Sequence, residues 1–479
     1  MNKSIIRYIL CRVLQFEGVF MLLPCIVALI YKEKDGFVFL IIGLVSLALG
    51  TIGSFFKPKS DVFYAREGFV TVSLSWILLS LVGATGFVFT GAIPNYVDAF
   101  FETVSGFTTT GATILTDVET MSQTVMFWRC FTNWIGGMGV LVFIISILPL
   151  SGSHNMHLMK AESTGAEVGK LVPKIQDTAK ILYGMYLGLS CVLFVAFIIA
   201  GLKPYDGLIL TFSTMGTGGF ANLNASLGGY SMPVQTIATI FMILCGVNFN
   251  AYFLLLNKKR KEFFRMEEVW TYLGIIAAAV LVITIQVRDM FDTAYEAFHH
   301  SAFQVASIIT TTGFATTDFD AWPMLSKGII LLCMVVGGCA GSTSGGIKVS
   351  RVIILFRTLK KEINHLTHPR SIKKVLFNGS AIAEETVKSV ESFIIAYMAI
   401  LLGSVLLVAI DGFDFTTTFT SVLTSVGNVG PGLSMVGPTG NFSGFSILSK
   451  LVLSFDMLAG RLELLPMLVL FCIRTWKKN

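Results

Sequence analysis

The sequence predicts an all-α membrane protein with ten transmembrane helices: two at the N-terminus, then four pseudosymmetric repeats of helix, half-helix, loop and helix around one axis. Three observations predict this fold: the composition, the number of long apolar runs, and four similar glycine-containing loops. Hydrophobic residues make up 54% of the chain and charged residues only 13%, which is unlike a soluble globular domain. The chain is therefore expected to lie in a lipid bilayer.

Ten apolar runs are each long enough to cross roughly 30 Å of hydrocarbon. The first is expected to be retained, because no small-residue cleavage site follows it. The predicted units are an N-terminal two-helix extension at 1–60 and repeats at 61–177, 178–266, 267–385 and 386–479. The runs lie near residues 8–31, 37–56, 67–91, 127–150, 178–201, 234–256, 269–287, 325–356, 387–410 and 446–473.

Lys and Arg concentrate in alternate connections between the runs, for example at 258–265 and 348–388. Cytoplasmic connections collect such residues, so both termini are predicted to be cytoplasmic and the four glycine loops to face outward. Anionic headgroups attract basic segments next to a membrane. The net charge of +6 is thereby explained without a nucleic acid partner.

Each of the four loops contains a glycine that a hydroxyl residue precedes by six positions. The loops follow stretches too short to cross a bilayer, which are predicted as half-helices at 96–107, 205–215, 295–309 and 414–426. The second loop offers two adjacent glycines, of which Gly219 has the hydroxyl residue Ser213 six positions before it, and in the fourth loop Asn428 and Val429 replace the threonines. The candidate ion-binding residues are Thr109, Thr110, Gly111, Thr217, Gly218, Gly219, Thr311, Thr312, Gly313, Asn428, Val429 and Gly430.

Half-helices that descend from the outer face would point their partially negative carboxyl ends at the middle of the membrane. Irregular backbone at that depth is tolerated only inside protein or beside a watery cavity. Rings of backbone carbonyls can replace the hydration water of potassium, and glycine permits the dihedral angles that this requires. One such loop would favour simple helix packing, but four in register favour a pore with K+ as the transported ion.

Three further stretches resemble a known family: Trp-Ile-Gly-Gly-Met-Gly at 134–139, Asn-Phe-Asn at 248–250 and Leu-Ala-Gly-Arg-Leu-Glu at 458–463. Over essentially its whole length the chain resembles the potassium-translocating membrane subunit of the Trk/Ktr/HKT superfamily, nearest the bacterial TrkH type. The resemblance implies potassium uptake across the bacterial cytoplasmic (inner) membrane and no organic cofactor. It also implies a homodimer with one pore in each subunit and a cytoplasmic, TrkA-like nucleotide-binding regulatory subunit. Glycine at all four aligned positions resembles the potassium-selective branch.

The segment 337–348 interrupts the eighth apolar run with five glycines in ten residues. Each glycine weakens a helix by roughly 1 kcal/mol relative to alanine, so a break is expected. A phosphate-binding loop is not indicated, because Ile347 precedes Lys348 and no strand comes before the segment. The resemblance implies an intramembrane gating loop that must move to open the pore. The candidate gating residues are Gly337, Gly338, Gly341, Ser342, Thr343, Gly345, Gly346, Lys348 and Arg461.

Arg461 lies about midway along the last run, where a cation costs roughly 2.5–3.5 kcal/mol on insertion scales. Two roles are open. The arginine could clamp neighbouring carbonyls or Glu463, or it could repel potassium and latch the glycine-rich segment; the family pattern favours the second role. Arg129, by contrast, is expected to snorkel to the outer interface.

Other functions are disfavoured. The eight cysteines show no pairing or cluster pattern, so neither a disulfide framework nor a zinc site is expected. No acid–base pair or nucleophile motif predicts an enzyme. A secondary transporter with broken helices would have inverted repeats, whereas these repeats share one orientation. The alternative that stays open is the potassium-binding membrane subunit of an ATP-driven pump complex, which the length and Arg461 disfavour.

Overall fold

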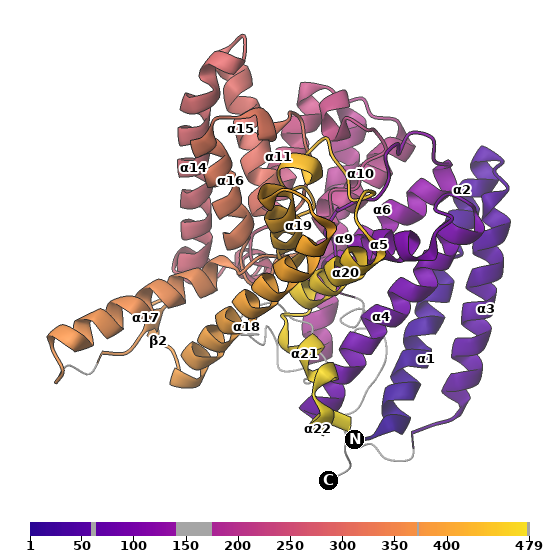
Figure 1. The fold of residues 1–479 in the computed structure, drawn as a ribbon, viewed down its shortest axis with the longest axis horizontal. Coiled ribbons are helices and arrows are strands. Elements are labelled where there is room, and N and C mark those ends of the chain that lie inside the picture. The colour runs from indigo at the N-terminus through magenta and orange to yellow at the C-terminus, as the bar shows by residue number, and fades with distance from the viewer. Residues whose placement is uncertain (59–63, 140–174, 371–372, 477–479) are drawn as a thin grey trace.

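The computed structural model describes residues 1–58, 64–139, 175–370 and 373–476. These residues are mostly helical (Figure 1). The one sheet in the described part of the chain is a small antiparallel hairpin of β1 (Leu376–Phe377) and β2 (Ser380–Ala381), in which Leu376 pairs with Ala381. The fold is therefore built by packing helices.

The N-terminal helices form a pair at one side of the molecule (Figure 1). Helices α1 (Lys3–Phe20) and α2 (Leu23–Tyr31) together make one apolar span, and α3 (Asp35–Phe55) returns beside it. Small residues allow the close approach: a methyl group added to Gly50 would lie 2.7 Å from the carbonyl oxygen of Cys11. Such contacts are typical of helices that pack in lipid.

The rest of the chain contains four groups of elements in the same order: a long helix, a short helix, a loop and one or more further helices. The first group is α4 (Ala65–Phe89), α5 (Tyr96–Phe107) and α6 (Gln123–Met138). The second is α9 (Ile175–Ile199), α10 (Pro204–Gly216), α11 (Met232–Cys245), α12 (Phe249–Leu256) and α13 (Arg260–Phe264). The third is α14 (Glu267–Val287), α15 (Ala294–Ile309), α16 (Met324–Val336) and α17 (Val349–Thr367). The fourth is α18 (Glu384–Val408), α19 (Phe415–Gly427), α20 (Ile447–Arg461), α21 (Leu465–Phe471) and α22 (Ile473–Trp476).

By length and composition, six of the described helices can cross a membrane, or seven if the bent pair α11 and α12 counts as one span. The eighth predicted run is divided at 337–348, as its glycines predicted. Of the fourth run, residues 140–150 lie outside the described residues.

Two further runs form broken helices, which the apolar pattern did not predict. In the run at 234–256, α11 and α12 meet at 88°, and the Asn248 side chain caps α12 by accepting from the Asn250 amide at 2.9 Å. In the run at 446–473, α20 ends at Arg461, and Glu463 and Leu464 have φ of 63° and 62°. Apolar composition reports burial and not backbone conformation, so it cannot reveal such breaks.

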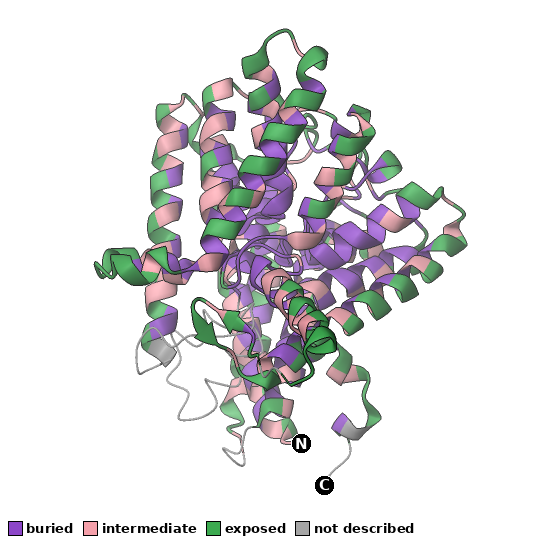
Figure 2. Ribbon diagram, turned by 90° about the vertical axis from the view of Figure 1, so that its left-hand side faces the viewer, coloured by how far each residue is buried: buried purple, intermediate pink, exposed green. Residues whose placement is uncertain are grey.

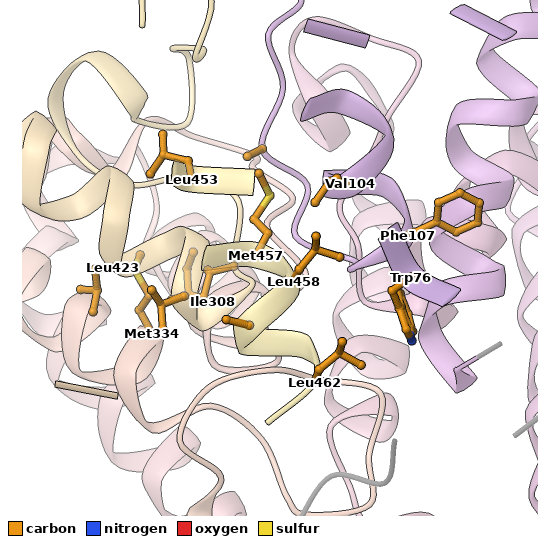
Figure 3. Close-up of a cluster of buried hydrophobic side chains, with 14 of the residues drawn as sticks. Trp76, Val104, Phe107, Ile308, Met334, Leu423, Leu453, Met457, Leu458 and Leu462 are labelled. Atoms are coloured by element: carbon orange, nitrogen blue, oxygen red, sulfur yellow. The ribbon is translucent and has the colours of Figure 1, made fainter. Parts of the chain in front are cut away.

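Burial increases toward the centre of the molecule, and the outer helix faces are exposed (Figure 2). On α18, for example, Ile395 is 71% and Leu406 74% exposed. Apolar side chains on the outside fit contact with lipid tails. Inside, Met457 and Leu458 of α20 are fully or almost fully buried and belong to a cluster with Val104 of α5 and Leu423 of α19 (Figure 3). Helix α20 therefore connects the first and fourth groups.

Candidate functional site

The four short helices α5, α10, α15 and α19 match the predicted half-helices to within one residue at each end. Three of them begin with a side-chain cap: Asn95 accepts from the Val97 amide, Thr293 from Glu296 and Asp414 from Thr417. Such caps satisfy amide groups that have no partner within the helix. The acids that the sequence singled out near these starts, Asp98 and Asp206 among them, complement the positive helix end.

The loops after these helices share one backbone conformation, which confirms their alignment. The residue two positions before each aligned glycine has a left-handed φ, although three of the four are β-branched threonines, for which this conformation is strained. The values are 55° at Thr109, 53° at Thr217, 54° at Thr311 and 53° at Asn428. The aligned glycines have φ of 80° at Gly111, 68° at Gly219, 84° at Gly313 and 101° at Gly430. Gly219, and not Gly218, is thus the equivalent glycine of the second loop.

The hydroxyl residue six positions before each glycine also has a common role: its carbonyl accepts a hydrogen bond from the amide just before the glycine. The four bonds are Thr110 to Ser105 at 2.9 Å, Gly218 to Ser213 at 2.9 Å, Thr312 to Ser307 at 2.8 Å and Val429 to Thr424 at 2.9 Å. In two loops the hydroxyl itself donates to the carbonyl just after the glycine, from Ser307 to Phe314 at 2.6 Å and from Thr424 to Pro431 at 3.3 Å. The repeated residue therefore shapes the turn.

The four glycines form a closed ring of contacts between loops. A methyl group added to Gly111 would lie 2.5 Å from the carbonyl oxygen of Gly218, and one on Gly430 would lie 2.6 Å from that of Thr110. Added methyl groups on Gly219 and Gly313 would likewise overlap the carbonyl oxygens of Thr312 and Val429. Each loop thus contacts the next, and the fourth contacts the first. No side chain larger than hydrogen fits at these positions without movement.

A cavity of about 160 Å³ lies against this glycine ring, and all four aligned glycines line it. The other lining residues, such as Thr113, Asn224, Ala315 and Pro431, follow the glycines along the chain. The cavity is therefore on the side of the ring toward which the loops return. In the described part of the chain, no group of three or more His, Cys, Asp or Glu side chains could hold a metal ion.

The segment 337–348 lies against the other side of the ring. The Gly345 amide donates to the Thr311 hydroxyl at 2.6 Å, and the Gly346 amide donates to the Gly427 carbonyl at 3.0 Å. Thr311 and Gly427 stand where α15 and α19 end. The segment also contacts the end of α11, because the Cys339 amide donates to the Gly246 carbonyl at 2.9 Å.

Arg461 contacts this segment directly. Its guanidinium donates to the Thr343 carbonyl at 2.8 Å, and also to the Gly136 and Gly137 carbonyls at 2.5 and 2.8 Å. The arginine thus joins α20 to the segment and to the end of α6. Glu463, which sequence offered as a partner of Arg461, forms an ion pair with Arg351.

The remaining predicted gating residues lie within the segment. Gly337, Gly341 and Gly346 have positive φ, and Lys348, also at positive φ, turns its ammonium back to the Ser344 and Cys339 carbonyls. Three other residues of the segment are small and make close contacts with neighbouring residues. These are Gly338 beside Ser344, Ser342 hydrogen-bonded to Ser344, and Gly345 beside Gly427.

Sequence reasoning missed two acidic residues and misplaced one arginine. Glu268 accepts from the amides of Ala340 and Ser350 at 2.6 and 3.1 Å, so it holds both ends of the gating segment. Arg129 does not snorkel to the interface: it is 2% exposed and donates to Glu102 at 2.7 Å. The acid Glu102 near the middle of half-helix α5 was the available signal, but its partner is not deducible from spacing.

Proteins similar to this chain in sequence and fold are named as cation or potassium transporters. The family model named TrkH, described as a cation transport protein, matches residues 35–478. The Trk system potassium uptake protein TrkH of Salmonella typhimurium is 35% identical over 484 residues, with 99% of both chains covered. The Trk system potassium uptake protein TrkG of Escherichia coli K12 is 33% identical, with 100% of both chains covered. A crystal structure of the potassium transporter TrkH from Vibrio parahaemolyticus matches with a TM-score of 0.88 at 33% identity, covering 99% of both chains.

Proposed function

Because the chain belongs to the TrkH family of cation transport proteins, we propose that its four glycine loops are the selectivity filter of a potassium uptake pore in the bacterial cytoplasmic membrane. The chain is a potassium transporter and not an enzyme. The observation that carries the filter assignment is the closed ring in which each aligned glycine contacts a carbonyl of the next loop.

The filter works through backbone oxygens. The carboxyl ends of α5, α10, α15 and α19 lead into the ring and contribute partial negative charge there. Carbonyls of the residues around Gly111, Gly219, Gly313 and Gly430 replace the hydration water that potassium loses. The fourth loop differs chemically, because the Asn428 side chain donates to the Thr110 hydroxyl at 3.0 Å and to the Met457 carbonyl at 2.8 Å.

The segment 337–348 is the gate. Its contacts with Thr311 and Gly427 support a position across the inner end of the filter, where it would obstruct permeation until it moves. Arg461 acts as latch and as electrostatic barrier, since it holds the Thr343 carbonyl and adds a cation to the ion path. The low helix propensity of the glycines suits a segment that changes conformation.

The finer architecture belongs to the same proposal: ten transmembrane helices in a two-helix extension plus four repeats, both termini in the cytoplasm, a homodimer, and a cytoplasmic TrkA-like regulatory subunit. The common order of elements in the four groups and the Lys and Arg residues gathered in alternate connections support it. The relatives' names refer to a Trk system, which fits a multi-component assembly.

Flux measurements on the purified chain in proteoliposomes test the function. We expect potassium and rubidium to permeate better than sodium, with no ATP and no other chain. The variant Gly111→Ser should lower the potassium over sodium preference, because its side chain would press on the Gly218 carbonyl. Reversal potentials that Gly111→Ser leaves unchanged would remove the filter assignment. A strict requirement for a separate ATP-hydrolysing chain would instead favour the pump-complex alternative.

A further inference from the structure

We propose that the buried ion pair of Glu102 and Arg129 is a positioning element that sets the spacing between the first and second filter loops, and thereby the potassium selectivity. This inference rests on the proposed filter. It assigns a role to two charged residues that neither coordinate the ion nor belong to the gate.

Glu102 binds the segment that follows Gly111 in the first loop. Its side chain is fully buried, and its two oxygens accept from the Thr113 hydroxyl at 2.9 and 3.1 Å. One oxygen also accepts from the Ile114 amide at 2.9 Å. Thr113 and Ile114 follow Gly111 by two and three positions. The carboxylate therefore connects the half-helix α5 to the segment at Thr113 and Ile114 through which the chain leaves the filter.

Arg129 connects that carboxylate to the second loop. Its Nε donates to Glu102 at 2.7 Å, and its Nη1 donates to the Ala221 carbonyl at 3.2 Å. The guanidinium also lies over the Phe220 ring, 3.7 Å from its centroid, where the face of the ring attracts a cation. Phe220 and Ala221 directly follow Gly219. One chain of charged contacts thus spans two neighbouring loops.

Among the described residues, this charged pair, a brace between two loops, occurs in the first repeat, whereas half-helix side chains of the other repeats, such as Gln304 and Thr420, hold their loops by hydrogen bonds without an ion pair. In the other three repeats, the positions equivalent to Glu102, nine residues before the aligned glycine, hold Leu210, Gln304 and Ser421. At the sequence spacing of Arg129, eighteen residues after the glycine, the other repeats hold Ile237, Leu331 and Leu448. Burying two charges is expensive unless they are paired and hydrogen-bonded, so an apolar pair would pack as well. The charged pair differs from an apolar pair because it forms directional hydrogen bonds to both filter loops.

The pair also affects the charge at the pore entrance. Arg129 is the one charged residue among those that line the described cavity of about 160 Å³ outside the glycine ring. With Glu102 beside it, the cation is neutralised at close range. Without Glu102, an uncompensated positive charge would face the entering potassium. Removal of the acid and removal of the base should therefore change potassium affinity in opposite directions.

The experiment compares Glu102→Gln, Arg129→Gln and the double variant in proteoliposomes, with reversal potentials and the half-saturating potassium concentration as readouts. Glu102→Gln should lower the potassium over sodium permeability ratio about tenfold, the value of one charge-assisted hydrogen bond, and raise the half-saturating concentration. Arg129→Gln should lower that concentration. The double variant should restore the half-saturating potassium concentration, because neither charge is left unpaired. It should not restore the permeability ratio, because the two filter loops are still not joined by the ion pair.

Asp98→Asn is the matched control. Asp98 lies one turn earlier on α5 and forms an equally short ion pair, 2.6 Å to Lys450, but this pair joins α5 to α20 and not to a filter loop. A folded Glu102→Gln with the wild-type ratio, or an equal loss of selectivity in Asp98→Asn, would overturn the inference. Should Glu102→Gln not fold, Thr113→Val removes the hydroxyl bonds to Glu102 together with the acceptor of the Leu115 amide; it should lower the ratio, and an unchanged ratio would count against the brace. If Gly111→Ser alters selectivity while these variants do not, the filter assignment stands and only the brace fails.

Discussion

The latch role of Arg461 makes a quantitative prediction for basal flux. Arg461 makes three charge-assisted hydrogen bonds, of which one, to the Thr343 carbonyl, holds the gating segment. A bond of this kind contributes about 1.5–3 kcal/mol. Its loss in Arg461→Ala should therefore shift the gating segment toward its open position by about 10- to 150-fold.

The assay is rubidium uptake into proteoliposomes that contain the purified chain without any regulatory subunit. Basal uptake by Arg461→Ala should rise at least about tenfold. Arg461→Lys separates latch from barrier: it keeps a cation near the ion path, but one ammonium on a shorter stem cannot reach all three carbonyls. A latch predicts increased leak in both variants, whereas a pure electrostatic barrier predicts it in the alanine variant alone.

The bonds to Gly136 and Gly137 provide the test of the structural clamp, because they join α20 to α6 and not to the gate. If Arg461 is only a clamp, Arg461→Ala should lower the melting temperature of the purified protein without increasing leak. A variant that melts and elutes like the wild type and shows wild-type uptake would refute the latch.

Two further predictions concern residues that sequence reasoning missed or could not place. Glu268→Ala removes the acceptor for the Ala340 and Ser350 amides, so the gating segment should open more readily and rubidium leak should rise, with an unchanged potassium over sodium ratio. Equal leak in variant and wild type, or altered selectivity, would contradict this role. Gly219→Ala should abolish potassium flux or prevent folding. The new methyl group would overlap the Thr312 carbonyl, and residue 219 has a φ of 68°, which strains any residue but glycine. Gly403→Ala on α18 is its control, since nothing lies within 4 Å of the added methyl group; normal flux of Gly219→Ala would show that the ring tolerates a side chain.

The sequence by itself determined the membrane environment, the four half-helices and the aligned glycines. These features are local: apolar length, caps such as Asn95 and Asp414, and a hydroxyl residue at constant spacing act within a few residues of the chain. The glycine-rich break at 337–348 was predictable for the same reason, because helix propensity is a property of the segment itself.

The spacing from Ser213 selected Gly219, but only the tertiary structure showed that Gly219, and not Gly218, shares the positive φ and the loop contact of the other glycines. It also decided the partner of Arg129, which lies 27 residues from Glu102 along the chain and 2.7 Å from it in space. Long-range pairing depends on how the helices pack, and composition carries no record of that packing. The hydrogen bonds of Glu268 to the gating segment were not predictable for the same reason. An acid in the first turn of a helix is also explained by its favourable interaction with the helix end alone.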